Sequence, residues 1–197
     1  MTAIGAPSLE GPISEAELVA GIAVRDEAAF RIAIEQHGKL LHRIAYRMMG
    51  EPHEAEDIVQ ETMLRLWDHA PRLEARGNPA PKLAAWLKRV CINLAIDRLR
   101  VMKRNSDVEV PERADATPLA DAQMQTIEES TAARALIAQL PQNQRAAIVL
   151  TYYEEMSNSD AAEAMEMKIK AFESLLHRAR IALRKGYADQ QSGGEVV

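Results

Sequence analysis

Residues 54–67 read EAEDIVQETMLRLW, and the interpretation of the whole chain starts from this stretch. Wound as an α-helix, it carries polar residues around a single Leu64 on one face: Asp57, Gln60, Glu61 and Asp68. A solvated face explains most patterns of this kind, but a leucine set among acids also suits a docking surface for a basic partner helix. The opposite face has the spacing of a helix that packs on a core, with Ala55, Ile58, Val59, Thr62, Met63 and Leu66.

The composition favours an all-α protein with aliphatic cores. The 197 residues are 47% hydrophobic but only 4% aromatic, and no alternating β-branched run bounded by turn residues predicts a sheet. This length fits one domain or two small ones. The single Cys91 excludes an intramolecular disulfide. Because no charged-then-apolar leader and no long uncharged run is present, we expect a cytoplasmic protein without membrane insertion.

The net charge of −5 conceals a segregated charge pattern. Segment 82–104 holds seven cations against Asp97, and segment 168–185 holds six against Glu173. Between them, segment 107–129 holds seven acids against Arg113. Two basic segments joined by an acidic connector suit a nucleic-acid partner better than the total charge suggests.

The first half of the chain predicts a helical domain at 14–104, behind a disordered tail at 1–13. The capping box Ser14-x-x-Glu17 opens its first helix. Further helices are expected at about 26–36 and 39–49, then the 54–67 helix beginning near Pro52, a proline-rich loop at 69–81, and a long helix at 83–104. The expected buried stripe of that last helix is Leu83, Trp86, Leu87, Val90, Leu94 and Val101, and Trp67 is also expected in the core.

One flank of the 83–104 helix carries Arg89, Asn93, Arg100 and Arg104. This row fits either an ordinary solvated face or contacts to phosphates and base edges, and its spacing does not decide between them.

The second half predicts an acidic flexible linker at 105–126, a second helical domain at 127–187 and a disordered tail at 188–197. Extended, 22 linker residues span about 75 Å, which is roughly two turns of DNA. Ser157-x-x-Asp160 caps a short helix that precedes a longer basic one. This is the helix-turn-helix pattern, although a four-helix bundle with a basic face is the alternative. The expected buried residues include Tyr152 before the motif and, in the longer helix, Ile169, Phe172, Leu176, Ala179 and Leu183.

Four blocks occur in the order found in the extracytoplasmic-function (ECF) group of bacterial RNA polymerase sigma factors. The chain resembles this group over about residues 15–187, interrupted by the connector. The resemblance implies an all-α fold with a sigma-2 and a sigma-4 domain. The blocks are Ala29-Phe30, the 54–67 helix, LAAWLKRVCINLAIDRLR at 83–100, and the run from LPQNQRAAIVL through SNSDAAEAM to ESLLHRARIALRKG at 140–186.

The resemblance also implies partners and site residues. Asp57, Gln60, Glu61 and Leu64 would dock on the β′ clamp helices of core RNA polymerase, while sigma-4 rests on the β flap. The loop at 70–82 and the 83–104 helix would recognise and open the −10 element. The connector would thread the polymerase cleft, and an anti-sigma factor would hold the protein inactive. The −10 residues would be Arg89, Asn93, Arg100 and Arg104, and the −35 residues Lys168, Lys170, Ala171, Glu173, Ser174, His177 and Arg178.

Two departures from the family pattern stand out. Met165-Glu166 occupies the helix-turn-helix break where Leu-Gly is usual, and glutamate costs about 1 kcal/mol in a left-handed turn. Glu173 and Leu175 stand where cations are common, which predicts a weaker phosphate grip and an unusual −35 preference. Few aromatics are available for melting DNA, so we expect strict promoter use.

Two other functions would each require a feature that this sequence does not show. A stand-alone helix-turn-helix regulator should have a dimerisation helix, and none is evident. A sigma-mimicking adaptor that sequesters an anti-sigma factor should have a receiver domain with βα alternation, which is lacking. No enzyme, cofactor or metal site is expected, because His53-Glu54 lacks the second histidine of a zinc motif and no nucleophile–base pair appears.

Overall fold

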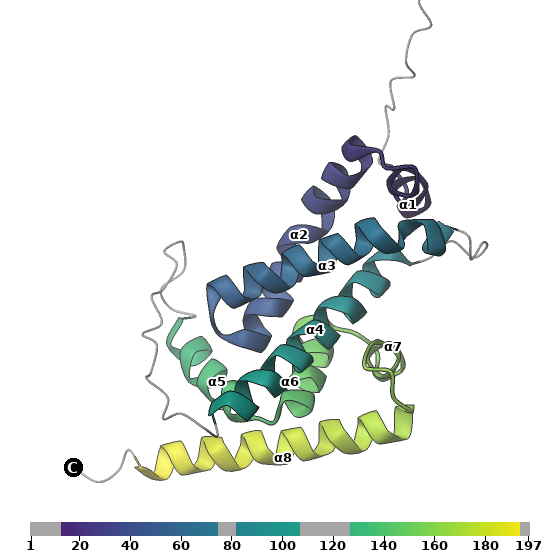
Figure 1. Cartoon of the computed structure of the whole chain (residues 1–197). Helices are drawn as coiled ribbons and strands as arrows, with labels where there is room; N and C mark the ends of the chain where they lie inside the picture. The colour runs from purple at the N-terminus through teal and green to yellow at the C-terminus, as the bar shows by residue number, and fades with distance from the viewer. Residues whose placement is uncertain (1–12, 75–81, 107–126, 194–197) are drawn as a thin grey trace, which may run out of the picture.

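The computed structural model describes residues 13–74, 82–106 and 127–193, which form helices packed around one continuous apolar core (Figure 1). No strand occurs in these ranges. The all-α class predicted from composition is therefore confirmed.

The first helices of the chain are α1 (Glu15–Ala23) and α2 (Glu27–Met49). Two helices were predicted where α2 runs without a break, and that prediction was wrong. Gly38 does not interrupt the helix, because buried residues on both sides of it share one stripe and hold the turns together. The helix ends at Gly50, whose φ of 75° is left-handed and whose N–H donates to the Tyr46 carbonyl at 2.8 Å. The stripe comprises Ala33, His37, Leu41, Ile44, Ala45 and Met48.

Helix α3 (Pro52–Glu74) continues past the point where a loop was predicted. Residues 69–74 are therefore helical, and the predicted loop was wrong there. Pro71 lies inside the helix and cannot donate to the Trp67 carbonyl. Arg25 fills this vacancy, because its Nη1 donates to that carbonyl at 2.7 Å and its guanidinium lies 5.0 Å from the Trp67 ring centroid. Burial of Ala70 and Leu73 then holds the last turns in place. Positions 75–81 of the predicted loop lie outside the described residues.

Helix α4 (Leu83–Ser106) fully buries only Leu83 and Leu87 of the predicted stripe. Trp86, Val90 and Leu94 are only half-buried and Val101 is 42% exposed. The helix lies between α2 and α3 on one side and α6 and α7 on the other, so apolar residues occur on several of its faces (Figure 1). Periodicity could not select the central stripe, which is Leu83, Leu87, Cys91, Ile92, Ala95 and Ile96.

The second half contains α5 (Ile127–Gln139), α6 (Gln142–Ile148), a π-helical turn η1 (Val149–Tyr153), α7 (Asn158–Ala164) and α8 (Ile169–Gly193). Two predicted burials and one predicted exposure were wrong here. Tyr152 is 52% exposed because the wide turn of η1 shifts the register, and Ile169 is 46% exposed because it begins α8. Leu175, predicted on the outer face, is 8% exposed because it extends the buried stripe of Phe172, Leu176 and Ala179.

The turn between α7 and α8 adopts the conformation predicted to be costly. Glu166 has φ 53°. The Glu166 N–H donates to the Glu163 carbonyl at 3.0 Å, and the Met167 N–H donates to the Ala162 carbonyl at 2.9 Å. These two bonds are those of a Schellman motif, which normally ends in glycine.

The two halves pack against each other. Helix α2 contacts α5, α6 and η1, and α4 contacts α6 and α7 (Figure 1). Helix α4 extends to Ser106, and 107–126, most of the predicted linker, lie outside the described residues. Helix α8 continues to Gly193, so the tail predicted from 188 is helical as far as that residue. We call this packed arrangement the closed form.

Candidate functional site

The outer face of α3 is exposed as predicted. Asp57, Gln60 and Glu61 are exposed, and Leu64 is 58% exposed between them. Thr62 is buried, and its hydroxyl donates to the Ile58 carbonyl at 2.7 Å, so the polar residue on the inner face is satisfied within the helix. An exposed leucine ringed by polar side chains therefore remains available on a helix held firmly by its other side.

Two arginines partly neutralise this acidic face. Arg98 of α4 binds Glu54 at 2.6 and 3.1 Å and reaches Asp57 at 3.8 Å. The hydrogen bond with Glu54 raises the pKa of Arg98. Arg65 pairs with Glu61 at 2.9 Å. The Glu61–Arg65 pair was detectable from its i,i+4 spacing, whereas the contact of Arg98 depends on the packing of two helices.

The predicted −10 flank of α4 is continuous but unevenly exposed. Arg89 and Asn93 are half-buried, and Arg100 and Arg104 are exposed. Arg100 also pairs with Asp97 at 2.8 Å. The two exposed guanidiniums are accessible to a phosphate chain, and the two half-buried residues lie nearer the α3–α4 junction.

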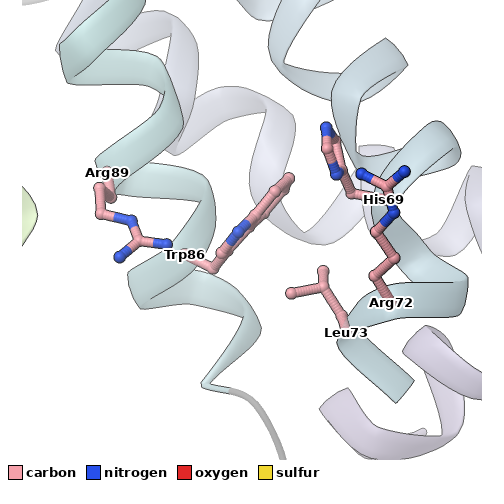
Figure 2. Close-up of a pocket in the computed structure, with 5 residues that line it drawn as sticks. All are labelled: His69, Arg72, Leu73, Trp86 and Arg89. Atoms are coloured by element: carbon pink, nitrogen blue, oxygen red, sulfur yellow. The ribbon is translucent and has the colours of Figure 1, made fainter. Parts of the chain in front are cut away.

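A pocket of about 260 Å³ lies where α3 ends and α4 begins. Figure 2 shows its lining: His69, Arg72 and Leu73 come from α3, and Trp86 and Arg89 from α4. Among its described lining residues there is no acid, and the centroids of the His69 and Trp86 rings lie 6.2 Å apart. A flat indole beside guanidinium groups suits a flat ring that carries negative charge nearby. Sequence reasoning missed this pocket because it assigned the end of α3 to a loop.

Glu15 of α1 caps the start of α4. Its carboxylate accepts from Leu83 N–H at 2.8 Å and from Ala84 N–H at 3.2 Å. Lys82, which precedes the helix, has no acceptor to serve as a cap. The cap therefore comes from another helix, and no local sequence signal reveals it.

The predicted −35 residues share one exposed side of α8. Ser174 donates from its hydroxyl to the Lys170 carbonyl at 2.9 Å, and Arg178 donates to the Ser174 carbonyl at 3.3 Å. Leu175 does not belong to this surface, so it does not replace a DNA-facing cation. The exposed set is Lys168, Lys170, Ala171, Glu173, Ser174, His177 and Arg178.

Two buried groups have altered acidity. Burial raises the pKa of Cys91 to about 12, and its thiol donates to the Leu41 carbonyl at 3.7 Å. Burial lowers the pKa of His37, with the charge of Glu15 opposing the shift. Cys91 is thus an unreactive core thiol, and His37 is favoured in its neutral form.

In the parts of the chain that the structure describes, no group of three or more His, Cys, Asp or Glu is placed to hold a metal ion. Among the described helices, none combines the length and apolar character needed to cross a membrane.

Comparison with known proteins identifies the family. Residues 33–105 match the family model of Sigma-70 region 2, and residues 130–183 match that of Sigma-70, region 4. The chain is 35% identical over 172 residues to the ECF RNA polymerase sigma factor SigL of Mycobacterium tuberculosis, covering 84% of this chain and 93% of SigL. The chain belongs to the ECF sigma factors. The predicted resemblance is confirmed.

One more ECF sigma factor and two solved structures are similar to this chain over most of their length. SigW of Bacillus subtilis is 30% identical over 175 residues, covering 83% of this chain and 91% of SigW. Among solved structures, the sigma factor RpoE of Bartonella quintana, crystallised with the anti-sigma factor NepR, has a TM-score of 0.63 at 22% identity and covers 81% of this chain and 96% of RpoE. CnrH in complex with the cytosolic domain of CnrY has a TM-score of 0.59 at 24% identity, covering 87% and 95%.

The two family matches divide the helices of this ECF sigma factor between region 2 and region 4. Region 2 spans most of α2, all of α3 and nearly all of α4, while region 4 spans α5 to the middle of α8. Helix α1, which carries the capping Glu15, lies outside both matches.

Proposed function

We propose that this ECF sigma factor binds core RNA polymerase in the cytoplasm and directs promoter-specific initiation. The exposed Leu64 among Asp57, Gln60 and Glu61 is the observation that carries the docking proposal. A leucine on a polar rim gives an apolar anchor, and the acids give orientation toward a basic helix. We place this face on the β′ clamp helices and region 4 on the β flap.

The −10 element is assigned to the α3–α4 junction. The pocket beside Trp86 and Arg89 offers a stacking surface and cations for an unstacked nucleotide, and Arg100 and Arg104 extend the cationic flank toward the backbone. Asn93 completes the proposed set.

The −35 element is assigned to the exposed side of α8. Ala171 and Ser174 are small enough for close approach to base edges, while Lys168, Lys170 and Arg178 suit phosphates. Glu173 is suited to accept from a cytosine amino group.

Transcription with core polymerase and a promoter library tests the proposal. The unaltered chain should confer specific start sites, and Asp57→Lys with Glu61→Lys should abolish both polymerase binding and initiation while helical content is retained. Glu27→Lys with Glu35→Lys makes the same charge change on exposed positions of α2 and should leave both activities intact. Polymerase binding without start-site choice would overturn the proposal.

We also propose control by an anti-sigma factor. Support comes from the fold neighbours RpoE and CnrH, which were solved with NepR and CnrY. If the free protein binds specific DNA sites tightly and regulates transcription without joining polymerase, it is a stand-alone regulator. If it binds an anti-sigma factor but does not support initiation, it is an adaptor.

A further inference from the structure

One carboxylate of region 4 is buried among cations of region 2. The Glu154 side chain is 2% exposed, and its oxygens lie 3.7 Å from Arg43 Nε, 3.5 Å from Arg47 Nη1 and 3.9 Å from Lys88 Nζ. Arg43 and Arg47 are one turn apart on α2, and Lys88 comes from α4. Three cations on two helices thus converge on a single acid supplied by the other region.

The cluster of Arg43, Arg47 and Lys88 is under-neutralised even in the closed form. Within the described residues, these three cations form ion pairs with Glu154 alone. Burial lowers the pKa of Arg47, and the charge of Arg43 adds to that shift while Glu154 opposes it. Removing Glu154 would leave three like charges around one point, which strongly favours capture of another anion.

A second contact between the regions carries a cost. Arg145 of α6 is 8% exposed and donates to the carbonyls of Met48, in α2, and Ala138, in α5. Within the described parts of the chain its Nε has no hydrogen-bond partner, and burial lowers the pKa of Arg145. A guanidinium buried without a carboxylate is expensive to desolvate, so separating the regions relieves part of that cost.

Promoter reading is incompatible with the closed form. Helix α4, proposed for the −10 element, packs against α7 of the helix-turn-helix proposed for −35. On DNA these elements are roughly two turns apart, about 70 Å. Region 4 must therefore leave region 2, and Glu154 must leave the cluster.

We propose that the cluster of Arg43, Arg47 and Lys88 is a binding site for a phosphate of promoter DNA, and that Glu154 occupies it in the closed form. This inference rests on the proposed function. Two guanidiniums and an ammonium directed at one point match the several oxygens of a phosphate. Lys88 precedes Arg89 on α4, so the cluster lies on a face of that helix about 100° from the one that carries Arg89. Opening exchanges an internal carboxylate for a DNA phosphate.

The first experiment removes the internal anion from the full-length chain. Glu154→Gln should increase the separation of fluorophores attached at Glu35 and Arg184, two exposed positions on α2 and α8. It should also tighten binding of a promoter fragment by about tenfold, the effect of one charge-assisted contact. Glu155→Gln, an exposed neighbour, should change neither value. Unchanged separation and DNA affinity for Glu154→Gln would overturn the proposal.

A reciprocal variant separates phosphate binding from simple opening. Arg47→Gln also weakens the contact with Glu154 and should open the molecule, but it should not tighten DNA binding. Equal tightening by Glu154→Gln and Arg47→Gln would mean that opening alone is responsible, and the phosphate site would be rejected. Circular dichroism of each variant establishes that the helices are intact.

The second experiment measures salt dependence in the polymerase holoenzyme. Arg43→Gln with Arg47→Gln should reduce the slope of log affinity against log salt by about one, as expected when one phosphate contact is lost. Arg31→Gln with Lys39→Gln, at exposed positions of the same helix, should leave the slope unchanged. An unchanged slope for the first pair would overturn the proposal and favour an acidic protein segment as the ligand.

These readouts distinguish the two proposals. Failure of every variant, and of the unaltered chain, to bind core polymerase would defeat the proposed function. The phosphate site would still be tested by the affinity of the free Glu154→Gln and Arg47→Gln proteins for DNA, a measurement that does not involve polymerase.

Discussion

At the scale of single residues, intramolecular partners moderate the charges of the exposed α3 face that we propose for docking, which carries Asp57, Gln60, Glu61 and Leu64. Arg65 holds Glu61, and Arg98 reaches Asp57, so an incoming cation must compete for both acids. Leu64 is therefore exposed to a partner, whereas the charges of Asp57 and Glu61 are already partly engaged within the molecule.

Replacing Arg65 should strengthen docking. Arg65→Ala frees the Glu61 carboxylate, and because exposed pairs contribute about 0.2–1 kcal/mol, we expect polymerase affinity to rise by about 1.4- to fivefold. Fluorescence anisotropy with labelled protein measures this. Arg31→Ala, also exposed on a neighbouring helix, is the control, and weaker binding by Arg65→Ala would show that the arginine itself contacts polymerase.

The left-handed Glu166 is a second feature of this scale. Glu166→Gly should stabilise the chain by about 1 kcal/mol, because glycine adopts φ 53° without steric cost. The melting temperature should rise by about 2–4 °C. Glu163→Gly, within α7, should lower it instead, and a fall in both variants would contradict this account of the turn.

At the scale of elements, two helices depend on groups from elsewhere in the chain. The start of α4 is capped by Glu15, and the proline-containing end of α3 is completed by Arg25. Both contacts link region 2 to the residues that precede its family match.

Removing the Glu15 cap should loosen the first turn of α4. Glu15→Ala should cost about 0.5–2 kcal/mol, the value of a helix cap, and should speed hydrogen exchange at Leu83 and Ala84. Glu17→Ala disrupts the capping box of α1, and it should leave those two amides protected. Equal exchange in both variants would mean that general loosening of α1, rather than loss of the cap, is responsible.

A double-mutant cycle tests the role of Arg25. Arg25→Ala removes the donor to the Trp67 carbonyl, and because this hydrogen bond is exposed to water it should cost about 0.5–1.5 kcal/mol. In a Pro71→Ala background the restored backbone N–H can donate to that carbonyl, so the cost should shrink. Urea unfolding of the unaltered chain, the two single variants and the double variant gives the coupling free energy between Arg25 and Pro71. If the two single effects on the free energy of unfolding simply add, Arg25 does not replace the missing backbone donor.

The residues that the sequence could predict were those governed by local periodicity. The buried stripe of α3 and the Ser14 and Ser157 caps follow from spacing alone, whereas the strained turn at Glu166 was predicted from the resemblance to the family. Only Leu83 and Leu87 of the core face of α4 followed from spacing, because a helix packed on both sides has apolar residues on several faces. The contacts of Arg98, Glu15 and Arg25 join residues 42–69 positions apart, so no local pattern contains them.

At the scale of the whole molecule, regions 2 and 4 share one apolar core. Both tryptophans, Trp67 and Trp86, lie in region 2. A core that is continuous across the regions should transmit destabilisation from one to the other.

A substitution in region 4 should therefore be visible in region 2. Phe172 is fully buried in α8, and Phe172→Ala should cost about 3–5 kcal/mol. Tryptophan emission and far-ultraviolet circular dichroism should then show the same lowered midpoint. Phe172→Leu should give a smaller shift in both signals, and an unmoved tryptophan transition would show that the regions unfold independently.

The position of Arg145 has a consequence for how the molecule returns to rest. When the regions part, its bond to Ala138 travels with region 4, because both residues belong to that half, while the Met48 carbonyl stays behind at the end of α2. The proposed separation of the regions would therefore break one of these two hydrogen bonds and leave the other inside region 4. A guanidinium still bonded to Ala138 would need to recover only the Met48 carbonyl when the regions close again.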